Sequence, residues 1–357
     1  MKKNLIRVLM CFSLLTVIMG GCGKDSEVTY ERGERKEQGQ TKEIEETDVP
    51  AIEDSSTEIE TGEKEEPLTE VTDPSNGFVK PAAEDFVYEY DTLLEGIVIT
   101  KYTGEAEAIC IPAQIDGDTV KAVKIPFNHQ IAQIELPDSI IECSFWGCSS
   151  LTEITIPNGV TSLENNAFAN CSSLTSITIP GNVTIIGKNA FHSCDALTSV
   201  TLLDGVTTIR EMAFYGCSSL ANITLPDSTI FIDNGVFYGC TSLTSITLPD
   251  GVRGIAGGMF SGCSNLTNIN LPDSVRDIDI YAFADCSSLT SITIPDRVTS
   301  IGAYAFSGCS SLTSVTISDN VTDIGHSVFY NCDNLKVTYQ GQEYTSENDP
   351  DDWWQPK

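Results

Sequence analysis

Residues 243 to 266 read Leu-Thr-Ser-Ile-Thr-Leu-Pro-Asp-Gly-Val-Arg-Gly-Ile-Ala-Gly-Gly-Met-Phe-Ser-Gly-Cys-Ser-Asn-Leu, and the rest of the chain is organised around this stretch. Its apolar letters return at a step of 23 residues in both directions. The step holds for leucine from Leu151 to Leu335, for phenylalanine from Phe145 to Phe329 and for cysteine from Cys148 to Cys332. A fixed period of about 20–29 residues predicts a solenoid of stacked coils.

The start of each repeat alternates apolar and polar residues, which predicts a short strand. In the stretch above, Ile246 and Leu248 are expected to face inward, and Pro249 ends the strand because it has no N–H to donate. Met259, Phe260 and the following cysteine lie at helical spacing, so one or two helical turns are expected on the far wall. The predicted fold is a leucine-rich repeat solenoid with short parallel β-strands on one face and helical or irregular turns on the other.

One coil cannot be stable alone. Ordering its backbone costs roughly 1–2 kcal/mol per residue. Burial of its few apolar side chains, at about 1.5–3 kcal/mol each, does not offset that cost. Stacking removes the flanks of each coil from water, so an array of several coils with end caps is expected.

Charge restricts the class of partner. The 357 residues carry 51 acidic and 20 basic side chains, a formal net charge of −31. A chain this acidic is expected to repel nucleic acid and anionic lipid.

The N-terminus, residues 1–22, is predicted to be a lipoprotein signal peptide. Basic residues precede an apolar run from Val8 to Met19, which is too short for a transmembrane helix. Gly20-Gly21-Cys22 resembles the cleavage box of bacterial lipoproteins, which implies that Cys22 is a lipid anchor. Met19 departs from the leucine usual there, and an ordinary secretory signal is the alternative.

Four further segments follow. Residues 23–85 are acidic and poor in bulky apolar side chains, so a disordered acidic tether is expected. Residues 86–105 are predicted to form an N-terminal cap of two strands around a turn. The solenoid is expected over 106–340 as eleven coils, mostly of 23 residues, and residues 341–357 form a C-terminal tail with a closing strand. The tail contains Trp353 and Trp354, which either cover the last coil or are exposed.

The repeat has a known counterpart. Leu289 to Cys309 reads Leu-Thr-Ser-Ile-Thr-Ile-Pro-Asp-Arg-Val-Thr-Ser-Ile-Gly-Ala-Tyr-Ala-Phe-Ser-Gly-Cys, which resembles the BspA-like leucine-rich repeat family of bacterial surface proteins. Leu203 and Ser318 replace the proline, and Cys143 replaces the turn isoleucine. The resemblance implies a curved parallel β-solenoid with a role in adhesion or recognition outside the cell. It does not imply a particular ligand.

The nine cysteines in register are expected to be buried, reduced thiols that act as small apolar side chains. On successive coils they point in the same direction, which does not favour disulfides although exported proteins often form them. Cys110 and Cys143 lie outside the register and are the one candidate pair. No metal site is expected, because the sequence has neither a Cys-x-x-Cys pair nor paired histidines, and no cofactor is implied.

No catalytic residue is predicted. His129, His192 and His326 occupy different positions in different coils, and no nucleophile elbow or metal-binding helix motif is present. A row of aspartates follows the strand from Asp204 to Asp319. These carboxylates are expected to accept backbone hydrogen bonds in turns, and a calcium edge is the alternative.

Candidate binding residues are the tyrosines outside the core pattern: Tyr215, Tyr238, Tyr281, Tyr304 and Tyr330. Tyrosine is well suited to contacts with proteins and sugars, although scattered surface aromatics also occur without a function. The outward strand residues are short serines, threonines and asparagines, which suit either an exposed strand or a long repetitive ligand.

The leading hypothesis is a lipid-anchored protein at the bacterial cell membrane that faces outward and binds an extracellular protein or glycan. The alternative is a structural spacer, or an envelope component that associates with itself and has no external ligand.

Overall fold

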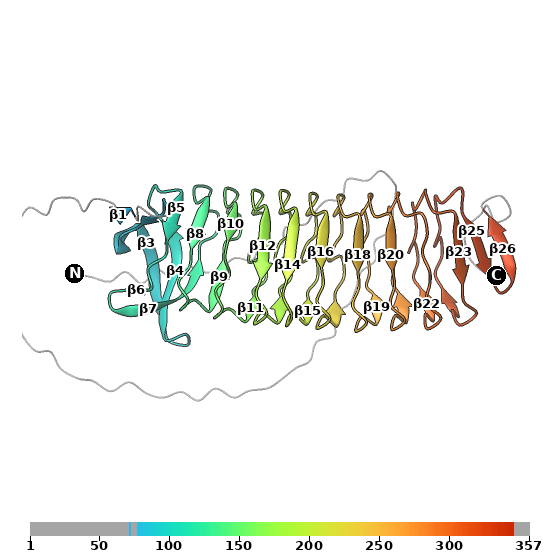
Figure 1. The fold of residues 1–357 in the computed structure, drawn as a ribbon, viewed down its shortest axis with the longest axis horizontal. Helices are drawn as coiled ribbons and strands as arrows, with labels where there is room; N and C mark the ends of the chain where they lie inside the picture. The colour runs from blue at the N-terminus through green and yellow to red at the C-terminus, as the bar shows by residue number, and fades with distance from the viewer. Residues whose placement is uncertain (1–70, 73–76, 346–357) are drawn as a thin grey trace, which may run out of the picture. The chain divides into compact units, whose positions relative to one another are not determined.

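The computed structural model describes Val71–Thr72 and residues 77–345. The described residues form a β-solenoid of about 11 turns that stack along one axis (Figure 1). The predicted fold class is therefore confirmed.

One wall of the solenoid is the ladder predicted at the start of each repeat. Its strands are β5 (Ala108–Cys110), β8 (Gln133–Glu135), β10 (Glu153–Ile154), β12 (Ser176–Ile179), β14 (Ser199–Leu202), β16 (Asn222–Thr224), β18 (Ser245–Thr247), β20 (Asn268–Asn270), β23 (Ser314–Ile317) and β25 (Lys336–Tyr339). Most neighbouring strands pair in parallel, and Ser176 of β12 lies opposite Ser199 of β14, one repeat later. We call this wall the first ladder.

A second ladder runs along the solenoid where the sequence predicted only a turn. Its strands are β7 (Asp118–Lys124), β9 (Glu142–Ser144), β11 (Ser162–Leu163), β13 (Ile185–Ile186), β15 (Thr208–Ile209), β17 (Phe231–Ile232), β19 (Gly254–Ile255), β21 (Asp277–Ile278), β22 (Ser300–Ile301) and β24 (Asp323–Ile324). Most have two residues, with the second side chain buried.

The far wall consists of irregular turns, and the expectation of helical turns there is wrong for the described coils. The amide of Cys263 donates to the carbonyl of Phe260, and that of Ser261 to the carbonyl of Gly258, so the turns close over three residues. Gly258 and Gly262, on either side of Phe260, have φ angles of 60° and 74°. A left-handed residue two positions before and two after the repeat phenylalanine prevents a continuous helix.

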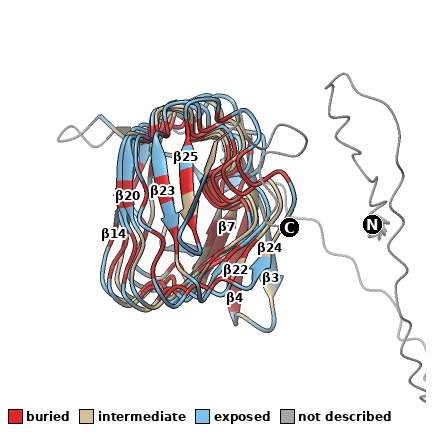
Figure 2. Cartoon of the chain, turned by 90° about the vertical axis from the view of Figure 1, so that its right-hand side faces the viewer, coloured by how far each residue is buried: buried red, intermediate tan, exposed pale blue. Residues whose placement is uncertain are grey.

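The core lies inside the coils, where Figure 2 shows the buried residues when the solenoid is viewed along its axis. The repeat phenylalanines are almost completely buried and stack in one column. Their ring centroids are 5.2 Å apart between Phe191 and Phe214, and 5.6 Å apart between Phe237 and Phe260. The phenylalanine of each inner coil therefore packs against the phenylalanines of both neighbouring coils. This contact contributes to the stability that a single coil lacks.

The N-terminal end is closed by the predicted cap. Strands β3 (Phe86–Asp91) and β4 (Gly96–Tyr102) pair antiparallel, and β4 continues in parallel to β7. The short strand β6 (Gln114–Ile115) pairs with the start of β7.

The predicted tether extends too far toward the C-terminus. Strands β1 (Val71–Thr72) and β2 (Val79–Lys80) pair with each other, β2 also pairs in parallel with β5, and the 3-10 helix η1 (Ala83–Asp85) follows. Because β5 would otherwise leave an unpaired edge, a short segment before residue 85 completes the first ladder.

The C-terminal end has the expected closing strand, because β26 (Gln342–Thr345) pairs antiparallel with β25. The predicted signal peptide, Cys22, residues 23–70 of the tether, Trp353 and Trp354 lie outside the described residues. Within the described part of the chain, no helix has the length and hydrophobicity needed to cross a bilayer.

Candidate binding surfaces

The outward side chains of the first ladder are exposed, as predicted. Ser245 and Thr247 of β18 point to solvent and the Ile246 between them is buried. The same alternation recurs in the other strands, so this face presents rows of short uncharged side chains. It lacks the aromatic and arginine side chains that usually contribute most to protein binding.

Two of the predicted tyrosines belong to a stacked group on the turn side. The ring of Tyr215 lies between those of His192 and Tyr238. Its centroid is 4.8 Å from each of them, and both interplanar angles are 6°. All three side chains are half-buried. We call them the N-side aromatic cluster. The same repeat position holds Ala169 and Ser261 in flanking coils, so the fold does not require a ring there.

A second group begins beside the first. A Cβ atom placed on Gly258 would lie 3.7 Å from Cδ2 of Tyr238, so the last ring of the N-side cluster lies against the following coil. One repeat after Gly258, the Tyr281 and Tyr304 rings stack at 5.1 Å, and His326 meets Tyr304 edge-on at 4.8 Å. We call Tyr281, Tyr304 and His326 the C-side aromatic cluster.

Backbone strain accompanies the C-side cluster. Tyr281 and Tyr304 have φ angles of 55° and 57°, and the equivalent positions in two earlier coils hold Gly235 and Gly258. A left-handed conformation costs a non-glycine residue of the order of 1–2 kcal/mol. Two tyrosines are therefore kept where glycine would be less strained.

Tyr330 is separate from both clusters. It occupies the repeat position of Tyr238, but Ser307 stands in the coil before it, and the Tyr330 side chain is 51% exposed. Among the described residues its ring has no stacked partner. The structure therefore brings together four of the five predicted tyrosines, as two pairs.

One exposed aromatic pair was missed by the sequence reasoning. Trp146 is 41% exposed and packs against Phe127, with ring centroids 4.7 Å apart. Trp146 lies four steps of 23 residues before Tyr238 and so occupies the same repeat position. The repeat could therefore have identified Trp146 as a candidate binding residue.

Burial affects the protonation of the N-side cluster. Burial lowers the pKa of His192, against smaller opposite effects of a backbone hydrogen bond and Asp195. Burial also raises the pKa of Tyr215, with a further contribution from Tyr238. Both shifts favour neutral rings, which suits contact with uncharged surfaces.

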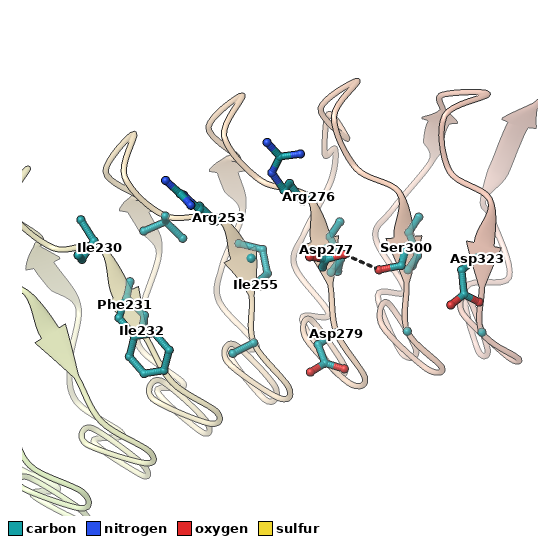
Figure 3. Close-up of a pocket in the computed structure, with 17 residues that line it drawn as sticks. Ile230, Phe231, Ile232, Arg253, Ile255, Arg276, Asp277, Asp279, Ser300 and Asp323 are labelled. Atoms are coloured by element: carbon teal, nitrogen blue, oxygen red, sulfur yellow. Dashed lines mark hydrogen bonds between the residues drawn. The ribbon is translucent and has the colours of Figure 1, made fainter.

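A groove of about 800 Å³ lies on the second ladder, spanning the coils from Ile230 to Gly325 (Figure 3). Ile230 and Phe231, 61% and 48% exposed, flank one end. Arg253 and Arg276 extend toward the same edge of the groove, and Asp277 accepts a hydrogen bond of 2.8 Å from Ser300. Sequence reasoning did not predict this groove, because its residues come from five coils.

The second ladder is interrupted at this groove. Strand β17 pairs with β15 and β19 pairs with β21, but among the described residues no ladder hydrogen bond joins β17 to β19. The first ladder is interrupted in the same coils, between β16 and β18. The turn wall remains joined, because Phe237 donates its amide hydrogen to Met259 at 2.9 Å.

The cysteine prediction is confirmed for the nine residues in register, which are buried thiols that form no disulfide. Burial raises the pKa of Cys217 and of Cys263 to about 12. Cys110 and Cys143 do not form a disulfide with each other, and they lie in different ladders. Within the described chain, no group of His, Cys, Asp or Glu side chains is arranged to hold a metal ion.

The aspartates after the first ladder differ from the expectation. From Asp204 to Asp319 their side chains are exposed, and in the described structure they accept no backbone hydrogen bonds. They form an acidic edge in contact with solvent.

Comparison with known proteins gives a family match. The family model described as a BspA type leucine rich repeat region (6 copies) matches residues 127–243 and 230–346. No curated protein sequence matches the chain.

Several solved structures are similar. A leucine-rich repeat protein of T. pallidum has 31% identity over 65% of this chain and 90% of its own, with a TM-score of 0.44. A leucine-rich cell surface protein of Faecalibacterium prausnitzii has 25% identity over 73% and 95%, with a TM-score of 0.35. A leucine-rich repeat protein of Bacteroides ovatus has 25% identity over 72% and 93%, with a TM-score of 0.30.

Proposed function

The chain belongs to the BspA-type leucine-rich repeat family, and on this premise we propose that it is a bacterial surface protein, lipid-anchored through Cys22, that binds an extracellular macromolecule. The observation that carries the proposal is the pair of aromatic clusters on the turn side. Rings occupy positions that most other coils fill with alanine, serine, glycine, asparagine or methionine, and two of the rings are kept at a cost in backbone strain.

The arrangement of the rings suits a macromolecule more than a small molecule. In each cluster two tyrosine rings stack on each other, so each ring covers a face of the other and leaves edges and hydroxyl groups to contact a partner. Rigid amphipathic edges repeated along several coils offer many weak contacts to a long partner, and their strengths combine when all are engaged at once.

An array tests the binding. The full chain, and a variant carrying Tyr215→Ser and Tyr238→Ser, are applied to immobilised matrix proteins and glycans. Binding by the full chain that the variant loses supports the proposal. A blank array, together with end-to-end association in solution, supports the structural spacer instead.

Anchoring is tested separately in a native host. Cys22→Ala should move the protein from the membrane fraction to the medium, because the lipid attachment would be lost. Equal recovery of both forms in the membrane fraction would exclude the anchor at Cys22.

A further inference from the structure

The groove that spans Ile230 to Gly325 on the second ladder has two arginines side by side at its edge. Arg253 and Arg276 occupy equivalent positions in adjacent coils, and the amide of Arg276 donates to the carbonyl of Arg253 at 2.8 Å. Both side chains are exposed. Adjacent like charges repel each other, so the pair is most stable when an anion lies between them.

No carboxylate of the described chain supplies that anion. The ion pairs of Lys124, Lys188 and Lys336 lie elsewhere and include neither arginine. Asp277, next to Arg276, is instead hydrogen-bonded to Ser300. The two guanidinium groups are free to hold a carboxylate from a ligand, with the paired donors that such groups offer.

Gly254, next to Arg253, also lines the groove, opposite Asp277 of the next coil and one repeat after Phe231. We call the part of the groove at Gly254 the notch. A Cβ atom on Gly254 would meet nothing closer than the carbonyl oxygen of Asp277, at 3.6 Å, and its φ is not left-handed. Neither packing nor backbone conformation therefore requires glycine here, and its effect is to leave the notch open.

The interrupted ladder adds polar groups to the notch. Because β17 and β19 are not paired, the amides of Arg253 and Ala256 lack the ladder partners that their equivalents have in other coils. The stack of Phe237 on Phe260 at 5.6 Å keeps these coils one spacing apart, so an added peptide strand does not fit between them. Small polar groups of a ligand fit better.

We propose that this groove binds a glycan in which a carboxylate-bearing sugar is flanked by neutral sugars. The carboxylate lies between Arg253 and Arg276, and the sugar ring lies over Gly254 against the exposed face of Phe231. The inference rests on the proposed binding function and assigns one of its ligand classes.

The acidic end of the groove favours a glycan over an acidic peptide. Asp277, Asp279 and Asp323 line the groove beyond the arginines. Their carboxylates accept hydrogen bonds from sugar hydroxyl groups, whereas further carboxylates on the ligand would be repelled by these residues and by the net charge of −31.

The test uses the purified full chain in calorimetric titrations. The probes are a sialic acid-terminated trisaccharide and an oligosaccharide that alternates glucuronic acid with N-acetylglucosamine. Each is compared with its form in which the carboxylates are reduced to alcohols, and a glutamate-rich peptide is titrated in parallel. At least one carboxylated sugar should bind, and its reduced form should bind at least about tenfold more weakly.

Three variants each introduce a residue that another coil already has at the same repeat position. Arg253→Thr and Arg276→Thr place the threonine that Thr207 and Thr299 provide at the same position, and each should weaken binding at least about tenfold. Gly254→Thr copies Thr208, preserves the fold and fills the notch, so it should weaken binding similarly. Arg297→Ser removes an arginine outside the groove and should leave binding unchanged.

Three results overturn the inference: neither sugar binds, the reduced sugars bind as well as the carboxylated ones, or the peptide binds more tightly with the same dependence on Arg253. The proposed function has a separate outcome. If a macromolecule on the array binds equally to the full chain and to Arg253→Thr while neither sugar binds in the titrations, binding stands and the sugar site fails, whereas a blank array rejects the function itself.

Discussion

The thiol of Cys240 donates a hydrogen bond to the carbonyl oxygen of Phe214, 3.2 Å away in the preceding coil. The same bond recurs from Cys171 to Cys332, each time to the phenylalanine 26 residues earlier, at 3.1 to 3.2 Å in most coils. The cysteine column thus joins each coil to the one before it, and only a protonated thiol can donate this bond.

Alkaline pH should therefore destabilise the solenoid. Burial raises the pKa of Cys263 from 9.0 to about 12. The stability that comes from the neutral thiol is complete below pH 9 and is lost as the pH rises toward 12. In urea unfolding at pH 7 to 11, stability should fall above pH 9, and Cys263→Ala should lessen the slope by about 1.4 kcal/mol per pH unit. An identical slope in the variant would contradict the buried thiol.

Thiol reagents give an independent measurement of burial. A maleimide should label the nine cysteines in register only after denaturation, because in the native coils they are shielded. The exposed fraction of Cys110 is larger, so it serves as the internal positive control in the native protein. Prompt native labelling of several cysteines in register would show that the coils open readily.

Phe237→Ala should lower the free energy of unfolding by about 3–5 kcal/mol, because the ring is fully buried between Phe214 and Phe260. Phe145, the first ring of the column, stacks on Phe168 on one side. Phe145→Ala should cost less, and denaturant midpoints of the two variants make the comparison. Equal losses would show that contacts with both neighbouring coils do not add to the stability of a coil.

The left-handed backbone at Tyr281 predicts an unusual order of variants. Tyr281→Gly and Tyr281→Ala both remove the ring, but only glycine also removes the strain at a φ of 55°. Tyr281→Gly should be more stable than Tyr281→Ala by about 1 kcal/mol in thermal unfolding. Tyr330 is not left-handed, so the same pair of substitutions there should give the opposite order.

Once a macromolecule is found to bind, variants can show whether it binds the turn wall or the wall formed by the first ladder. The variant with Tyr215→Ser and Tyr238→Ser should lose affinity. A variant with Thr224→Lys and Thr247→Lys, on the first ladder, should retain it. Loss only in the lysine variant, with unchanged circular dichroism, would place binding on the strand wall.

The sequence was sufficient for the repeat, the first ladder, the cap hairpin and the buried cysteines. Each of these depends on a pattern that returns at every step, such as the alternation around Ile246. The period also placed Tyr215 and Tyr238 one coil apart, which the structure shows as a stacked pair.

The second ladder and the turns could not be predicted in the same way. Strands of two residues, such as Gly254–Ile255, are too short to show an alternating pattern. The turn positions that require a left-handed backbone hold glycine in only some coils, and Tyr281 and Tyr304 conceal the signal in others. The spacing of Met259 and Phe260 then resembles a helix.

The constant hydrogen bond between each cysteine and the preceding phenylalanine has a consequence for how such a chain can change over generations. Removing one complete coil would bring together two ends that already match, so the thiol of one neighbour would meet the carbonyl of the other. Gene segments that encode single coils could thus be gained or lost without a new junction. Each event between the two aromatic clusters would alter their separation by about 4.8 Å, so the distance between the contacts to a ligand would change while each contact stays the same.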